Sequence, residues 1–202
     1  MTDNSKDEFI EITRIKEEFI ANASHELKTP IASVRLAAES ALTSLERDDG
    51  MTKSFLEQIL RDSDRMNELI SDLLDLSAME SSDVFMEAFD LHDVIANEIS
   101  YLSKQNKKRI SYKKKKVEIN ANFDDISLAV KNLIKNALKY SPPEENILIQ
   151  IEENDKSVRC SFQDFGSGIS KSDQEKIFER FYRVDKGRSR KVGGTGLGLA
   201  IV

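Results

Sequence analysis

Cysteine, long apolar runs and excess positive charge are scarce or missing from this chain, and each shortage excludes a class of protein. Cys160 is the single cysteine among 202 residues, so no intrachain disulfide can form and a reducing cytoplasm is the simplest compartment. No apolar run approaches the roughly 20 residues that cross a bilayer. The first residues also lack the basic and apolar regions of a signal peptide. The sequence therefore predicts a cytosolic segment.

Acidic residues outnumber basic ones by 36 to 30, which gives a formal net charge of -6. A general nucleic-acid binder needs a net basic surface, so we expect no nucleic-acid partner. Residues 104–116 run against this trend, because they hold eight positive side chains and no acid. We interpret this charge as solvated rather than as a contact for anionic lipid or nucleic acid, with residues 113–116 at the tip of a hairpin between strands at residues 109–112 and 117–120.

The first half of the chain has a helical pattern in two stretches, residues 7–45 and 52–79, joined by a turn that contains Gly50. In the first stretch the apolar steps alternate between three and four, as in the seam of a coiled coil or bundle. The seam residues are Ile20, Ala23, Leu27, Ile31, Val34, Ala38, Ala41 and Leu45. One hairpin cannot bury such a stripe alone, so we predict a homodimer that forms a four-helix bundle.

The second half interleaves helices with strands, which predicts an α+β sandwich. Asp90 is the expected cap of a helix, and a short helix is expected near residues 172–180. The other predicted elements are a helix at 125–140 and paired strands at 147–151 and 158–162. The polar residues 80–83 mark a boundary. We therefore assign residues 1–12 to a signalling-helix or linker remnant, 13–80 to the helical domain and 84–202 to the α+β domain.

His25 is the first candidate for chemistry. It lies about 200° around the helix from Ala23 and from Leu27, so it faces away from the packed stripe. Pro30 removes the hydrogen-bond donor for the carbonyl of Glu26 and predicts a bend just past His25. The Glu26 carboxylate can hold or deprotonate the imidazole, which is a nucleophile when neutral. The alternative is a surface histidine without a function, and we interpret His92 in that way.

A second candidate site lies on the helix at 125–140. Asn132 and Asn136 share one face, which Lys139 and Tyr140 extend. Amide oxygens suit Mg²⁺, and a lysine can meet phosphate, although a solvated polar face has the same pattern. Two glycine-rich loops follow, at 164–168 and 193–198, and such loops bring backbone N–H groups close to phosphates. The Asp164 carboxylate can accept a hydrogen bond from an exocyclic amine.

These motifs resemble the conserved boxes of sensor histidine kinases, in the order of that family. Ser24-His-Glu-Leu-Lys-Thr-Pro30 resembles the H-box of the HisKA phosphoacceptor domain. The N-box is at 132–140, the first G-box at 164–169, the F-box at 177–183 and the second G-box at 193–199 of a HATPase_c domain with the Bergerat or GHKL fold. The resemblance covers the chain from Ser24 to Leu199.

The resemblance implies that ATP and Mg²⁺ bind the second domain and that His25 is phosphorylated. It makes Glu26 the acid/base partner of His25, Asn136 the Mg²⁺ ligand and Asp164 the reader of adenine. It also implies transfer to an aspartate on the receiver domain of a response regulator, with Glu26 and Thr29 supporting a phosphatase reaction. The remaining implied nucleotide-site residues are Asn132, Lys139, Tyr140, Gly166, Gly168, Phe178, Arg183, Gly194, Thr195, Gly196, Leu197 and Gly198.

Two other functions are alternatives to the interpretation as a histidine kinase. ATPases of the same fold carry a glutamate that activates water where this chain has Asn132, and an amide cannot act as a general base. A non-enzymatic dimer module is the second competitor, because the chain ends at Val202, soon after the last motif. From that ending we expect an ATP domain that is incomplete at its C-terminus, in the cytoplasmic part of a membrane sensor kinase.

Overall fold

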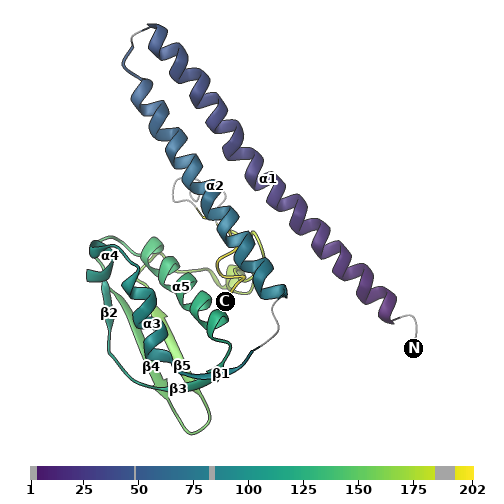
Figure 1. The fold of residues 1–202 in the computed structure, drawn as a ribbon, viewed down its shortest axis with the longest axis vertical. Coiled ribbons are helices and arrows are strands. Elements are labelled where there is room, and N and C mark those ends of the chain that lie inside the picture. The colour runs from purple at the N-terminus through teal and green to yellow at the C-terminus, as the bar shows by residue number, and fades with distance from the viewer. Residues whose placement is uncertain (1–3, 48, 82–84, 185–193) are drawn as a thin grey trace. The chain divides into compact units, whose positions relative to one another are not determined.

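The computed structural model describes residues 4–47, 49–81, 85–184 and 194–202 (Figure 1). The chain divides into two compact units, one comprising residues up to Leu73 together with the short stretch that ends at Thr195, and the other residues from Leu74 together with Gly196–Val202. None of the described helices is long and apolar enough to cross a membrane.

The first unit is a helical hairpin, as the sequence predicts. Helix α1 spans Asn4–Arg47, and helix α2 spans Thr52–Ser81, with its last turns in the second unit. Gly50 adopts a left-handed φ of 73° in the turn, a conformation that glycine accepts without strain. Asp49 fixes the turn, because its carboxylate accepts hydrogen bonds from the Met51 N–H at 3.0 Å and from the Ser44 hydroxyl.

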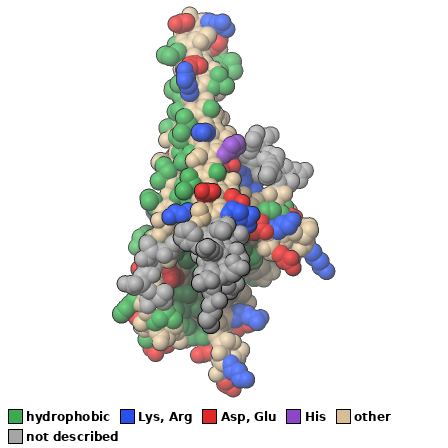
Figure 2. Space-filling view, turned by 90° about the vertical axis from the view of Figure 1, so that its right-hand side faces the viewer, with side chains coloured by type: hydrophobic (Ala, Val, Ile, Leu, Met, Phe, Trp, Pro, Cys, Tyr) green, Lys and Arg blue, Asp and Glu red, His purple; other side chains and the backbone are tan. Residues whose placement is uncertain are grey.

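Among the described residues, the hairpin has one apolar face that is buried and a second that is exposed. Ala37 and Ala41 of α1 are buried, as are Leu69 and Leu76 of α2. A second set of apolar side chains is at least 45% exposed. On α1 it comprises Ile20, Ile31, Leu42 and Leu45, which fall within about 60° of one another around the helix, and on α2 it comprises Leu56, Leu60 and Ile70. Hydrophobic side chains follow the long helices in Figure 2.

The second unit is built from short helices and two sheets. Its elements are β1 (Glu87–Asp90), α3 (Leu91–Ser100), α4 (Lys104–Lys108), β2 (Ile110–Tyr112), β3 (Glu118–Ala121), α5 (Phe123–Tyr140), β4 (Ile147–Glu153), β5 (Val158–Gln163) and α6 (Lys171–Gln174). Strands β1 and β3 pair antiparallel. In the other sheet, β4 pairs with β2 in parallel and with β5 antiparallel, so its strand order is β2-β4-β5.

The core of this unit lies between its helices and its strands. Ile147, Ile149 and Ile151 alternate along β4, and all three are buried on one face of the sheet. Ile95 of α3 and Ile134 of α5 are fully buried against them in the same cluster. Figure 1 shows α3 and α5 on one side of the strands. The predicted combination of a helical hairpin and an α+β sandwich is confirmed.

Two local expectations about the second unit are wrong. The strands near 109–112 and 117–120 do not form a hairpin with a lysine-rich tip, because β2 pairs with β4 and β3 pairs with β1. The helix expected at 172–180 is limited to α6, Lys171–Gln174, and turns follow it. The sequence pattern also gave no sign of β1 and α4, which have only four and five residues.

Candidate functional site

His25 is exposed on α1, as the helical periodicity predicts. The Thr29 hydroxyl donates a hydrogen bond of 3.3 Å to the backbone carbonyl of His25, one turn earlier. Helix α1 continues through Pro30, whose side chain is buried. The imidazole is therefore presented to solvent from a turn in which both Thr29 and Pro30 alter the regular hydrogen bonding of the backbone.

Glu26 is held by a residue that the sequence analysis missed. Arg65 of α2 donates a hydrogen bond from Nη2 to Glu26 Oε2 at 3.2 Å, and the two side chains are 21% and 30% exposed. The signal in the sequence was a charge at a helical spacing that places Arg65 on the same side of α2 as the buried Leu69 and Leu76. The acid next to His25 is thus fixed from the opposite helix.

The asparagine pair lies on α5, a helix whose N-terminus is capped by a side chain. The Asn122 side chain accepts a hydrogen bond from the Asp125 N–H at 3.1 Å and caps the helix. Asn132 is 3% exposed, and its Nδ2 donates to the carbonyl of Leu128 at 3.0 Å. Asn136 is half-buried on the same face.

Gly198 lies directly against the asparagine pair. A methyl group placed on Gly198 would lie 3.0 Å from Asn132 Oδ1 and 3.8 Å from Asn136 Nδ2. The structure therefore brings the second glycine-rich segment to the asparagine face of α5, as the motifs predict. Any side chain at this position would displace the amide of Asn132.

Asp164 follows β5 and is exposed next to the C-terminus of α5. Its Oδ1 accepts a hydrogen bond of 2.8 Å from the Gly166 N–H, and a methyl group at Gly166 would lie 2.8 Å from the Tyr140 carbonyl. The buried Ser141 hydroxyl accepts the N–H of Phe165 at 2.9 Å. In the sequence, Ser141 and Pro142 indicated only the end of the helix, and this contact with the loop that follows β5 was missed.

Arg109 organises the same corner of the unit. Its guanidinium donates to four backbone carbonyls, those of Leu138, Ser141, Pro142 and Glu145, at 2.8 to 3.3 Å. The planar, forked group of donors suits such a set of acceptors, and its positive charge lies near the negative end of the α5 dipole. Arg109 was interpreted only as one of a run of positive charges, because its partners lie about 30 residues away in the sequence.

The F-box and the second G-box are joined at one point. The Phe181 N–H donates to the Gly196 carbonyl at 2.8 Å, and a methyl group at Gly196 would lie 2.8 Å from the Phe181 carbonyl carbon. Phe181 has a φ of 64°, an unusual conformation for a bulky residue. The Tyr182 hydroxyl donates to Asp173 at 2.6 Å, and hydrogen bonds from Ser170 and Tyr182 lower the pKa of Asp173.

The other candidate nucleotide residues differ widely in their exposure. The Lys139 ammonium lies 5.5 Å from the centre of the Tyr140 ring, which is 54% exposed. Leu197 is fully buried, whereas Phe178 is 55% exposed. Gly168 is exposed with a φ of 73°, and Arg183 is half-buried. Gly194 and Thr195 are both buried, and they group with the first unit. Gly193, which opens the second glycine-rich loop, lies outside the described residues.

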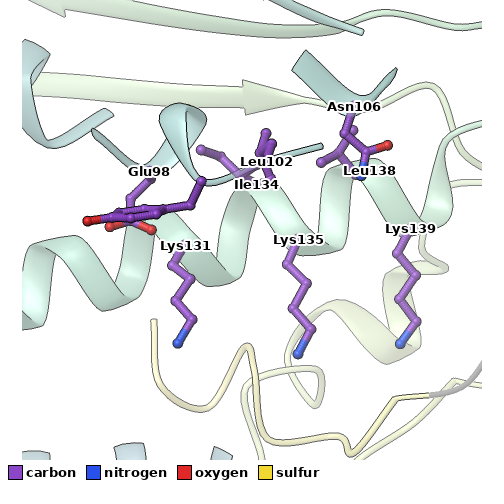
Figure 3. A pocket seen from close by; sticks show the side chains of 9 residues that line it. Glu98, Leu102, Asn106, Lys131, Ile134, Lys135, Leu138 and Lys139 are labelled. Carbon is purple, nitrogen blue, oxygen red and sulfur yellow. The ribbon is translucent and has the colours of Figure 1, made fainter. Parts of the chain in front are cut away.

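A groove of about 660 Å³ runs beside α5, between this helix and α3 and α4 (Figure 3). Figure 3 shows Lys131, Lys135 and Lys139, one per turn, pointing the same way along its edge. Of the candidate residues, only Lys139 is among the described residues that line the groove. The groove is therefore a neighbour of the asparagine face rather than the asparagine site itself.

His92 is not without organised surroundings, so the interpretation made from the sequence is wrong on this point. Its Nδ1 lies 2.9 Å from the Tyr112 hydroxyl, and the two rings stack with centroids 5.5 Å apart. Burial raises the pKa of Tyr112 to about 12 and that of Cys160 to about 11. The contacts of His92 with Tyr112 define a structural cluster.

Comparisons with known proteins agree with the motifs. Residues 15–82 match the His Kinase A (phospho-acceptor) domain, and residues 121–202 match the Histidine kinase-, DNA gyrase B-, and HSP90-like ATPase domain. The chain is 34% identical to the sensor-like histidine kinase SenX3 of Mycolicibacterium smegmatis, over 99% of this chain and 53% of the relative. It is 36% identical to the sensor histidine kinase WalK of Bacillus subtilis, over 92% of this chain and 32% of the relative.

Solved structures show the same fold. Histidine kinase ThkA, in complex with response regulator protein TrrA, matches 90% of this chain and 55% of its own with a TM-score of 0.70 at 20% identity. The Acinetobacter baumannii histidine kinase AdeS matches 88% of this chain and 83% of its own with a TM-score of 0.62 at 23% identity. The chain thus spans about half or less of the length of the curated relatives named above. It belongs to the family of sensor histidine kinases.

Proposed function

We propose that this chain binds ATP through its second unit and transfers the terminal phosphoryl group to His25. The observation that carries this proposal is the exposed imidazole of His25 beside a carboxylate that is fixed by the opposite helix. An exposed neutral imidazole is a competent nucleophile near neutral pH. We place the phosphoacceptor domain at residues 13–80 and the ATP-binding domain at residues 84–202.

The asparagine face supplies the groups that a nucleotide with Mg²⁺ requires. The family assignment implies ATP binding, and Asn136 offers a neutral amide oxygen of the kind that Mg²⁺ accepts. In the described part of the chain no three acidic, histidine or cysteine side chains gather into a metal site, which suits an ion held largely by phosphate oxygens. Bound Mg²⁺ would neutralise charge on the phosphates. Lys139 is the proposed phosphate contact and Asp164 the proposed acceptor for the adenine amine.

Asn132 supports transfer to a side chain rather than to water. Its amide donates to the Leu128 carbonyl and is nearly fully buried, so it has no basic group with which to activate a water molecule. In this position an amide cannot take a proton. We therefore expect hydrolysis of ATP to be slow relative to phosphorylation of His25.

The proposed acceptor of the phosphoryl group is an aspartate on a response regulator, and the structure of ThkA with TrrA is a complex of that kind. Thr29 supports a phosphatase reaction on the phosphorylated regulator. In that reaction, the Thr29 hydroxyl and the Glu26 carboxylate orient the water molecule that hydrolyses the phosphoryl group. The hydroxyl would have to rotate away from the His25 carbonyl, its present acceptor. We also propose that the exposed apolar face of the hairpin is covered by a second copy of this chain.

Labelled ATP with Mg²⁺ tests the proposed kinase activity directly. We expect the chain to take up phosphate in an acid-labile, alkali-stable linkage, and we expect His25→Gln to abolish the uptake. His92→Gln is the matched control and should keep it, because His92 lies in a structural cluster of the other unit. Acid-stable label would instead indicate a serine kinase, release of free phosphate without label an ATPase, and no reaction a binding module.

A further inference from the structure

Arg65 is a charged residue on a mostly buried face of α2, which also carries Leu69, Asp72 and Leu76. Positions 65, 69 and 76 lie on one face of α2, and Leu69 and Leu76 are 3% and 5% exposed. The Arg65 side chain is itself only 21% exposed. A guanidinium loses hydration at such a position, so its retention requires a partner that compensates for the loss.

That partner is Glu26, which belongs to the other helix. The two residues are 39 positions apart in the sequence, and Arg65 Nη2 lies 3.2 Å from Glu26 Oε2. The bond engages one carboxylate oxygen. Among the described residues, no other side chain bonds the carboxylate, so Oε1 remains available on the side chain that follows His25.

The other arginine on this stretch of α2 behaves differently. Arg61 is 61% exposed and contacts residues of its own helix, Glu57 at 3.9 Å and Gln58 at 3.0 Å. It therefore offers a matched comparison, because it carries the same charge one turn away without reaching α1.

We propose that Arg65 is a positioning residue for phosphorylation of His25, acting through Glu26. This inference rests on the proposed kinase function. In the reaction, one imidazole nitrogen forms a bond to the terminal phosphorus of ATP. The bond from that phosphorus to the bridging oxygen breaks, and ADP leaves with the electron pair. The proton on the other imidazole nitrogen is held by, or passes to, the Glu26 carboxylate.

The contribution of Arg65 is geometric. A glutamate has three side-chain torsions, and a carboxylate that samples several rotamers meets the imidazole only part of the time. The guanidinium binds Oε2 and leaves Oε1 to accept the imidazole N–H, which favours the tautomer with a free nitrogen lone pair toward ATP. Because Arg65 lies on α2, a movement of α2 relative to α1 would also move the Glu26 carboxylate.

Autophosphorylation rates of four variants test the inference. We expect Arg65→Gln to lower kcat about tenfold with the KM for ATP unchanged, and Glu26→Gln to lower kcat about a hundredfold. The double variant should be no slower than Glu26→Gln alone, because Arg65 has nothing left to position. Arg61→Gln is the control and should match the wild type. Multiplied effects in the double variant, or an unchanged kcat in Arg65→Gln, would overturn the inference.

A spectroscopic readout separates positioning from simple bracing of the hairpin. The ¹⁵N signals of the His25 imidazole report its tautomers without any nucleotide, and we expect Arg65→Gln and Glu26→Gln to shift them in the same direction. Arg65→Lys keeps the charge without the fork of donors, so it should shift them less, and it serves as the test if Arg65→Gln does not fold. Unshifted signals would overturn the inference. If the wild type takes up no phosphate from labelled ATP, that result would contradict the proposed kinase function and not the positioning of Glu26 by Arg65.

Discussion

Gly198 shows how one missing side chain shapes the proposed nucleotide site. Alanine at this position would place a methyl group 3.0 Å from Asn132 Oδ1, and that amide is buried and cannot move freely. We expect Gly198→Ala to weaken binding of an ATP analogue at least about tenfold, corresponding to about 1.4 kcal/mol, measured by isothermal titration. Gly50→Ala, in the hairpin turn, has nothing within 4 Å of the new methyl group and should leave binding unchanged. Equal affinities for both variants would show that Gly198 does not contact the site.

Asp90 gives the stability of the second unit a defined dependence on pH. Desolvation raises its pKa, but hydrogen bonds from the N–H groups of His92 and Val117 outweigh that effect, so the pKa lies below its ordinary value of 3.8. A carboxylate with a lowered pKa stabilises the fold above its unfolded pKa and loses that contribution as the pH falls through the folded pKa. The relevant window therefore lies below about pH 4.

The Asp90→Asn variant removes the titration and keeps an acceptor oxygen. We expect its free energy of unfolding, measured in urea, to be lower than that of the wild type at neutral pH and to fall less steeply below about pH 4. Asp155→Asn, in the exposed turn between β4 and β5, is the control and should follow the wild-type curve. Parallel curves for Asp90→Asn and the wild type would contradict this assignment.

At the scale of elements, Arg109 fastens the end of α5 to the start of β2. Arg109→Ala would leave the carbonyls of Leu138, Ser141 and Pro142 without their charged donor. We expect a loss of about 2 to 4 kcal/mol in the free energy of unfolding, and Arg109→Lys should restore only part of it, because an ammonium lacks the fork of donors. Urea titration measures both. Arg159→Ala, on the exposed face of β5, should cost less than about 0.5 kcal/mol.

The elements that could be predicted from sequence are those with strong periodicity and local stop signals. Helix α5 has a regular apolar stripe and ends before Pro142, and β4 and β5 alternate and are joined by a polar turn. Strand β1 has four residues, too few for a period to show. The pairing of β2 with β4 could not be predicted either, because β3 and α5 separate the two strands in the sequence and nothing local to either strand identifies its partner.

The candidate site divides in the same way. His25, Asn136 and Asp164 carry motifs that can be interpreted from adjacent residues. Arg65 and Arg109 have partners 29 to 39 positions away, and nothing in the local sequence names those partners. The roles of Arg65 and Arg109 depend on tertiary contacts, so these residues can be identified only once the fold is known.

At the scale of the whole molecule, the exposed face of the hairpin predicts association. Leu42 and Leu56 are 64% and 50% exposed, and a glutamate at each position would place charge in the proposed four-helix core. We expect the double variant Leu42→Glu, Leu56→Glu to be monomeric by light scattering and the wild type to be dimeric. Leu36 is 65% exposed but lies about 140° around α1 from Ile31, so Leu36→Glu should remain a dimer. A monomeric wild type would refute the proposed bundle.

The parallel pairing of β2 with β4 sets the order in which the second unit can fold. Ile110 pairs with Ile147, so this ladder closes a long loop that contains β3 and α5, whereas β4 and β5 are joined by a short turn. Closing a longer loop costs more entropy, so the β4–β5 hairpin with α5 should form in the transition state and β2 should dock later. In stopped-flow kinetics, Ile151→Val should slow folding and Ile110→Val should mainly speed unfolding. The reverse pattern would mean that the long-range ladder nucleates the unit.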